Sequence, residues 1–364
     1  MRETLKDLYS PLFIESFAGK VKGAYPPFDM PKFIGLIHDE TWAEEEFKQR
    51  IRHLTKALTE TLPSSYEEAL RILYAIAPEC RGIEYLFIPD FVELNGRGDF
   101  DRSMEALAFF TRFSTAEFAV RPFIIEDQER MLGQMEEWAR SDNEHLRRLA
   151  SEGARPRLPW APQLPELIRD PRPALPILDK LKADPSLYVR KSVANHLNDI
   201  SKDHPELVLD LARQWIGTDP LTNWIVKHAC RTLLRKGDVR ALALFGYEQM
   251  SGIVVDSLNI ATPVVSVGGE LEFSFDLVNG SSDTPRLRID YEIGYMKANG
   301  KQAPKRYKCS DKSYAPGHWK VGKKHSFKVI TTRRFYPGEH SLHILVNGER
   351  MASGTFVVEE AAYL

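Results

Sequence analysis

The sequence predicts a multidomain α + β chain, in which an all-α array of stacked helix pairs over residues 1–252 precedes an all-β sandwich over residues 253–364. Two observations predict it. Apolar residues recur at helical spacing up to about residue 250, and beyond residue 252 they alternate with polar residues at strand spacing. A chain of 364 residues is long enough for two domains.

The helical part begins with clear amphipathic segments. In the segment 42–62, apolar side chains at Phe47, Ile51 and Leu58 recur at helical spacing with charged residues between them. Ser65 is a candidate N-cap for a helix over 65–76, because acidic residues follow it in the first turn. Further helices are expected near 101–113, 117–139, 143–152, 173–183, 186–200, 204–217, 222–235 and 238–249.

These helices contain an internal repeat. A pair formed by a hydrophobic and a basic residue recurs at 120–121, 146–147, 189–190 and 226–227, and the later spacings approach the period of a HEAT repeat. HEAT units stack helix pairs into a superhelix with a concave inner surface. Arg121 and Arg190 would then begin second helices and line that surface, although a purely structural role explains each of them equally well.

Period-two alternation characterises the C-terminal part. Runs such as Leu271 to Leu277 and Leu287 to Ile293 are separated by Gly- or Asn-containing turns. Six to eight short antiparallel strands in about 110 residues indicate an immunoglobulin-like sandwich. The disulfide pair of immunoglobulin domains is absent, so the likeness concerns the architecture alone.

A polar face accompanies the apolar stripe of the helix expected at 186–200. Lys191, Asn195, Asn198 and Asp199 lie on this face at helical spacing. One end of the face therefore holds a carboxylate beside two amides. From periodicity alone an exposed helix surface is the favoured interpretation.

A loop rich in arginine and proline follows the helix at 143–152. Trp160 lies between two prolines, and an indole in such a loop could pack on a cationic base or on a sugar. Packing between two helix pairs explains the same tryptophan equally well. Arginines contact phosphate oxygens through a planar fork, and four precede Trp160: Arg147, Arg148, Arg155 and Arg157.

The clearest local charge lies within the sandwich. Between Lys297 and Arg334 twelve basic residues, among them Lys320, Lys323, Lys324 and Arg333, stand against the single acid Asp311, with aromatic residues between them. This composition favours binding to a nucleic-acid backbone. A solvated basic face or an acidic protein partner is the alternative.

Composition excludes several other classes. The three cysteines are far apart and lack metal-ligand spacing, so we expect reduced thiols, no metal and no cofactor. The N-terminal segment is charged and has no hydrophobic core of a secretory signal, and no apolar run is long enough to span a membrane. We expect a cytoplasmic, nucleoid-associated monomer.

Three segments together resemble a known family. They are STAEFAVRPFI at 114–124, LRRLASEGARPRLPWAP at 146–162 and DPSLYVRKSVANHLNDISKDHP at 184–205. They resemble the HEAT-like-repeat DNA glycosylases, in particular the AlkC type, some members of which carry a basic immunoglobulin-like C-terminal domain. The resemblance extends over essentially the whole chain.

The resemblance implies a monofunctional glycosylase for base excision repair. Its substrates would be cationic bases such as 3-methyladenine, 3-methylcytosine and 1-methyladenine in double-stranded DNA. By the resemblance, Glu117 and Asp199 match the catalytic carboxylates, whereas Arg148 and Trp160 match contacts close to the lesion.

The implied chemistry is physically consistent. Alkylation gives the base a positive charge, so its departure needs little acid catalysis, whereas the developing oxocarbenium-like sugar needs nearby negative charge and an oriented water. Two alternatives remain: a non-catalytic HEAT-repeat scaffold that binds protein, and a protein that binds damage without excising it.

Overall fold

The computed structural model describes residues 4–247, 251–329 and 334–360 and confirms the expected fold class, with helices followed by a β-sheet region. Arg333, which belongs to the basic segment, lies outside these residues. The chain divides into two compact units, one formed by residues 1–203 and 215–229 and the other by residues 204–214 and 230–364.

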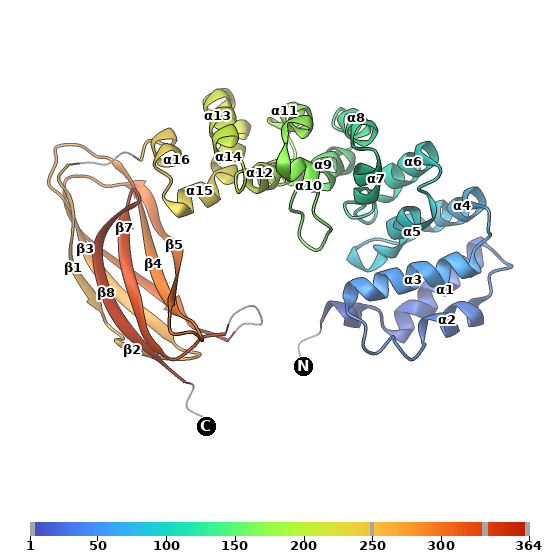
Figure 1. Cartoon of the computed structure of the whole chain (residues 1–364), viewed down its shortest axis with the longest axis horizontal. Coiled ribbons are helices and arrows are strands. Elements are labelled where there is room, and N and C mark those ends of the chain that lie inside the picture. Colours follow the sequence, from blue (N-terminus) through green and yellow to red (C-terminus); the bar gives the residue numbers. More distant parts are fainter. Residues whose placement is uncertain (1–3, 248–250, 330–333, 361–364) are drawn as a thin grey trace. The chain divides into compact units, whose positions relative to one another are not determined.

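The helices of the first unit follow one another in chain order, from blue to green in Figure 1. Their bounds are α1 (Pro11–Ala24), α2 (Met30–Ile37), α3 (Phe47–Thr61), α4 (Tyr66–Ile76), α5 (Phe87–Asn95), α6 (Phe100–Phe110), α7 (Arg121–Glu126), α8 (Gln128–Trp138), α9 (Glu144–Gly153), α10 (Pro165–Arg169), α11 (Leu175–Leu181), α12 (Leu187–Ile200) and α14 (Pro220–Ala229).

Local chemistry explains where these helices begin. Ser65 accepts a hydrogen bond from the backbone N–H of Glu68, which confirms the N-cap expected there. The single helix expected over 117–139 is wrong. Asp127 interrupts it, because its backbone leaves the helical region and its side chain caps α8 by accepting from Arg130 N. The expected helix also begins later, at Arg121, so Glu117 lies in the segment between α6 and α7.

The second unit combines three helices with a sandwich of two sheets. The helices are α13 (Pro205–Trp215, which ends one residue inside the first unit), α15 (Arg231–Lys236) and α16 (Val239–Leu244). The strands are β1 (Ile253–Ile260), β2 (Val264–Ser266), β3 (Glu270–Asn279), β4 (Arg286–Met296), β5 (Gln302–Ser313), β6 (Gly317–Ser326), β7 (Gly338–Val346) and β8 (Glu349–Glu359).

The two sheets have the strand orders β1-β3-β6 and β2-β8-β7-β4-β5. All pairings are antiparallel except that of β2 with β8, which is parallel and departs from the expected antiparallel pattern. Alternate side chains such as Phe273, Ile289 and Ile344 form the core between the sheets. Strands β5 and β6 each form one edge of a sheet.

The helices α15 and α16 pack on the sandwich within this unit. Tyr247, just after α16, donates to Asp311 of β5 at 2.8 Å, and Asp311 also pairs with Arg286. Gly237 and Gly348 lie against each other where the helices meet the sheet. A Cβ added to either glycine would lie 3.6–3.7 Å from the backbone of the other. A cut at residue 252 would therefore separate helices from the sheet that they contact.

Candidate active site

The two predicted carboxylates, Glu117 and Asp199, are joined by one chain of ion pairs. Glu117 pairs with Arg148 Nη1 at 2.5 Å, and Arg148 Nη2 lies 3.7 Å from Glu152. Arg155 then joins Glu152, at 2.6 Å, to Asp199, at 2.8 Å. Lys202 closes the series on the other oxygen of Asp199 at 2.8 Å. We call these six residues the ion-pair ladder.

The segment 114–120, the helices α9 and α12 and the residues that follow each helix (Arg155 and Lys202) build the ladder. The segment 114–120 carries Glu117, whose carboxylate also accepts a hydrogen bond from Thr115 at 2.9 Å. The helix α9 presents Arg148 and Glu152 one turn apart, since side chains at i and i+4 share a helix face. The last turn of α12 supplies Asp199, and Lys202 follows that helix.

The Asp199 end of the ladder is buried. Asp199 is only 2% exposed, and both its oxygens accept from cations. The interpretation of Asn198 and Asp199 as an exposed helix surface is therefore wrong for both residues, because both are buried. Asn198 donates to the carbonyl of Ala229 at 2.7 Å and so joins α12 to α14.

The ladder keeps its arginines charged. Burial alone would lower the pKa of Arg155, but the carboxylates of Glu152 and Asp199 raise it above its ordinary value. Burial would also lower the pKa of Arg148, but the carboxylates of Glu117 and Glu152 raise it above its ordinary value. Opposite charges that face one another in a shielded site favour the charged form of each.

Tyr188 completes the surroundings of Arg148. The guanidinium carbon of Arg148 lies 5.1 Å from the centroid of the Tyr188 ring, and this ring remains 41% exposed. The His145 ring contacts the Tyr188 ring edge-on, with the two centroids 5.8 Å apart. The sequence analysis missed Tyr188, although its place just before the repeated pair 189–190 was a usable signal.

Trp160 is exposed rather than packed between helix pairs. Its side chain is 57% exposed and touches Phe47 edge-on at 6.5 Å between centroids. Lys48 donates to the carbonyl oxygen of Trp160, and the same ammonium lies 4.9 Å from the centroid of Phe118, the neighbour of Glu117. Lys48 therefore joins the Trp160 loop to the segment that carries Glu117.

The other predicted arginines are engaged inside the protein. Arg121 has no exposed surface and donates to the carbonyl oxygens of Gly153 and Arg155, each at 2.9 Å, and to that of Pro162. Burial, aided by the charge of Arg155, lowers the pKa of Arg121 to about 10. In this arrangement Arg121 holds the backbone of the loop 153–162.

Arg190 is partly accessible and holds the backbone that precedes its own helix. It donates to the carbonyl oxygens of Asp184 and Pro185, at 2.7 and 2.8 Å, and lies 5.9 Å from the Trp224 ring. Arg147 and Arg157 pair with Asp184 and Asp203. The cluster that precedes Trp160 is therefore mainly a set of intramolecular ion pairs, with Arg148 directed to the carboxylates.

The predicted lysines of the sandwich lie on two neighbouring sheet edges. Lys320, Lys323 and Lys324 are exposed on β6, and Lys305, Lys308 and Lys312 are exposed on β5. The two edges are adjacent, because the Tyr307 ring of β5 lies 4.7 Å from His325 of β6. We call these six lysines the basic edge. Lys324 forms a surface ion pair with Glu272.

Two structural features are absent from the part of the chain that the structure describes. No group of three or more His, Cys, Asp or Glu residues there is arranged to hold a metal ion. Among the described helices none is long and apolar enough to cross a bilayer. Cys80 and Cys230 are buried free thiols and Cys309 is a half-buried one.

Comparisons with known proteins match successive parts of the chain and the chain as a whole. The DNA alkylation repair enzyme family matches residues 109–233, and the C-terminal Ig-like domain of uncharacterised protein YhaZ matches residues 254–360. The curated protein YhaZ of Bacillus subtilis (strain 168) is 46% identical over 97% of this chain and 99% of its own length.

A solved structure is similar over nearly the whole length. It is the alkylpurine DNA glycosylase AlkC of Pseudomonas fluorescens, bound to DNA that contains an abasic site analogue. It is 41% identical, covers 98% of this chain and 100% of its own, and superposes with a TM-score of 0.95.

Proposed function

This chain belongs to the AlkC family of DNA alkylation repair glycosylases, and on that premise we propose that it hydrolyses the N-glycosidic bond of cationic alkylated bases in double-stranded DNA. The expected substrates are 3-methyladenine, 3-methylcytosine and 1-methyladenine. The non-catalytic scaffold is set aside because the solved structure that matches nearly the whole chain is that of an alkylpurine DNA glycosylase. The observation that carries the proposal is the ion-pair ladder, which joins Glu117 to Asp199.

The reaction needs negative charge more than it needs a general acid. When the bond between C1′ and the base nitrogen breaks, its electron pair leaves with the base and cancels the positive charge there. Positive charge then develops on the sugar, and water adds to C1′ and gives up a proton. Fixed carboxylates stabilise the developing charge, and a carboxylate can accept the proton.

We assign the direct contact with the sugar to Glu117. It lies in a segment between helices beside the exposed Trp160 loop, whereas Asp199 is buried with both oxygens paired. The ladder is neutral as a whole, with three acids and three bases. A DNA phosphate that draws Arg148 or Lys202 toward itself would leave the carboxylates with net negative charge close to the reaction.

Trp160 and Arg148 are the proposed contacts to the lesion. An exposed indole offers a face to a cationic base or sugar, and Arg148 is the ladder arginine nearest to Glu117. Arg190 is proposed as a backbone contact through its accessible side. The placement of Arg121 favours support of the loop over contact with DNA, because its guanidinium nitrogens donate to backbone carbonyl oxygens.

Single-turnover release of 3-methyladenine from a dimethyl-sulfate-treated duplex tests the assignment. Glu117→Gln and Asp199→Asn keep side-chain size, and each should slow release by about a hundredfold, the effect of losing one fixed electrostatic group. Asp179→Asn is the matched control, because Asp179 forms only an exposed pair with Lys182. Near wild-type release by folded Glu117→Gln and Asp199→Asn proteins would remove both carboxylates from the mechanism.

The basic edge is proposed to hold the same DNA through phosphates. Six exposed lysines on two adjacent sheet edges suit a nucleic-acid backbone. Lysines also protect sheet edges from pairing with other chains, which is the simpler explanation of their position. If these lysines bind DNA, their replacement must weaken the dependence of DNA affinity on salt concentration. Edge protection predicts no such change.

The remaining proposals concern state and place. We expect a monomer that acts on DNA without a cofactor, in the cytoplasm and associated with the nucleoid. Sedimentation of the protein with and without duplex DNA would test the monomer, and a dimer in the absence of DNA would contradict it.

A further inference from the structure

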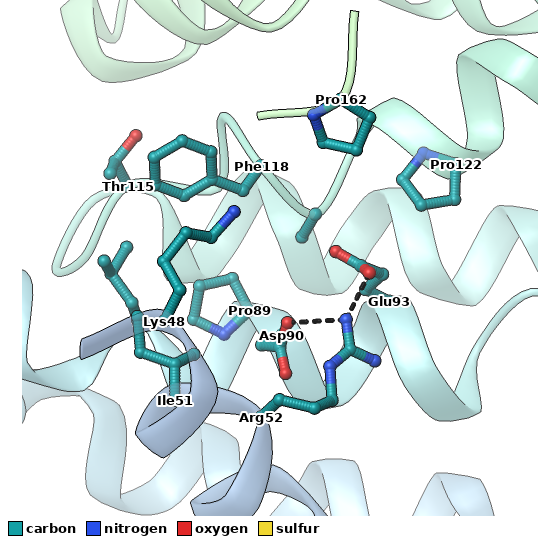
Figure 2. Close-up of a pocket in the computed structure, with 12 residues that line it drawn as sticks. Lys48, Ile51, Arg52, Pro89, Asp90, Glu93, Thr115, Phe118, Pro122 and Pro162 are labelled. Carbon is teal, nitrogen blue, oxygen red and sulfur yellow. Dashed lines mark hydrogen bonds and ion pairs between the residues drawn. The ribbon is translucent and has the colours of Figure 1, made fainter. Parts of the chain in front are cut away.

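A charged cavity lies beside the segment that carries Glu117. Its volume is about 260 Å³, and its walls come from α3, α5, the segment 115–122 and Pro162 of the Trp160 loop. Figure 2 shows the Lys48 ammonium beneath the Phe118 ring and Arg52 between Asp90 and Glu93. The Nη2 atom of Arg52 lies 3.0 Å from the carboxylate of Asp90 and also pairs with that of Glu93.

Lys48 lines this cavity and is a hydrogen-bond donor there. Burial lowers its pKa, and the carboxylates of Glu93 and Asp90 oppose that shift. Arg52 occupies those carboxylates directly, and Thr55 donates to Asp90 at 2.6 Å. The ammonium of Lys48 is thus free to reach the carbonyl oxygen of Trp160 and the face of Phe118.

The backbone of Trp160 needs such support. Its φ is +64°, in the left-handed region that a bulky residue rarely adopts, and such a conformation persists only where neighbours enforce it. Lys48 holds the carbonyl of Trp160, and Arg121 holds that of Pro162, two residues further on. The two cations therefore fix the exposed part of the loop from two sides.

We propose that Lys48 is a positioning residue for Trp160, which it places next to Glu117 by joining the Trp160 carbonyl to the Phe118 ring. This inference rests on the proposed role of Trp160 at the lesion. Lys48 itself lies under the loop, and it acts through the orientation of the indole. Removal of the Lys48 ammonium leaves the indole side chain itself unchanged but allows the strained backbone of Trp160 to relax.

Lys48→Met tests this, because methionine keeps the apolar stem and removes the donor. A hydrogen bond to a charged group contributes enough that single-turnover release of 3-methyladenine should fall about tenfold. Lys56→Met makes the same chemical change at an exposed position of the same helix and should leave the rate unchanged. An unchanged rate in Lys48→Met would overturn the proposal.

A double-mutant cycle separates positioning from general damage to the fold. If Lys48 acts through the indole, Lys48→Met should add nothing to the defect of Trp160→Ala. A further tenfold loss in the double variant would show that Lys48 acts by another route. Wild-type release by Trp160→Ala would overturn the inference while leaving the carboxylate mechanism intact.

A second readout does not depend on activity. With 5-fluorotryptophan incorporated, the ¹⁹F resonance of Trp160, assigned by its loss in Trp160→Phe, should shift or broaden in Lys48→Met and not in Lys56→Met. Absence of this change in Lys48→Met would contradict the positioning role. Failure of the wild-type protein to release any alkylated base would instead contradict the proposed function, and the ¹⁹F result would still decide the role of Lys48.

Discussion

Replacement of Arg155 by methionine probes the ion-pair ladder at its centre. Arg155 is buried and joins two buried carboxylates, Glu152 and Asp199, at 2.6 and 2.8 Å. Removal of one partner of a buried ion pair costs about 3–5 kcal/mol, because a charge remains without compensation. Each carboxylate keeps a second cation, Arg148 at 3.7 Å and Lys202 at 2.8 Å, so we expect about 3 kcal/mol.

The free energy of unfolding, measured by urea denaturation of the full chain with a helix-specific signal, provides the assay. Arg155→Met should lose about 3 kcal/mol, and Arg155→Met with Asp199→Asn should regain at least about 1 kcal/mol, because the stranded charge is removed. Arg169→Met, which breaks an exposed pair with Glu166, is the control and should change little. A loss below about 1 kcal/mol in Arg155→Met, or no recovery in the double variant, would refute the description of the ladder as a buried network.

Two further predictions follow from burial and charge. Burial lowers the pKa of His196 to about 4 against about 6.5 in the unfolded chain, so the neutral side chain stabilises the fold above pH 6.5 and this stability is lost as the pH falls toward 4. The free energy of unfolding should therefore fall by up to about 3 kcal/mol over that range. The His196→Asn variant should lack this part of the dependence of unfolding free energy on pH. An identical dependence in that variant would contradict the assignment to His196. Joint replacement of Lys320, Lys323 and Lys324 by glutamine should weaken duplex binding irrespective of sequence and reduce the slope of log affinity against log salt by about one for each lost phosphate contact. The same replacement at Lys32, Lys56 and Lys180 should leave the slope unchanged, and equal slopes for the two triple variants would limit the basic edge to protection of the sheet edges.

The change from helices to strands could be predicted because it depends on local periodicity. The helix expected at 186–200 corresponds to α12 (Leu187–Ile200), since its apolar stripe and its length are both encoded in the segment itself. The break at Asp127 was missed because an acidic residue inside an amphipathic pattern is also an ordinary exposed helix residue. Only its non-helical backbone shows it to be a cap.

The site was predictable in part. The resemblance selected Glu117, Arg148 and Asp199, and the structure joins all three in one ladder. The burial of Asp199 could not be inferred from its helix, because its partner Arg155 lies 44 residues away on another element. For the same reason the sequence did not reveal that Arg121 supports the loop, because the carbonyl oxygens that it binds lie more than 30 residues further along the chain.

Lys48 shows why tertiary contacts escape a sequence pattern. It lies on an amphipathic helix among other charged residues, and nothing in that helix distinguishes it from Lys56. Its significance comes from a carbonyl group 112 residues away. A backbone carbonyl leaves no trace in the amino-acid sequence, so residues that act on one are the hardest to predict.

The most direct test of the account is chromatographic identification of the bases that the full-length protein releases from two duplexes under single-turnover conditions. One duplex is treated with dimethyl sulfate and carries cationic 3-methyladenine, and the other carries the uncharged lesion hypoxanthine. The carboxylate mechanism predicts release of 3-methyladenine at a rate that Glu117→Gln lowers by about a hundredfold, with little release of hypoxanthine by either protein. Comparable release of hypoxanthine by the wild-type protein, or release of 3-methyladenine that is unaffected by Glu117→Gln, would contradict it.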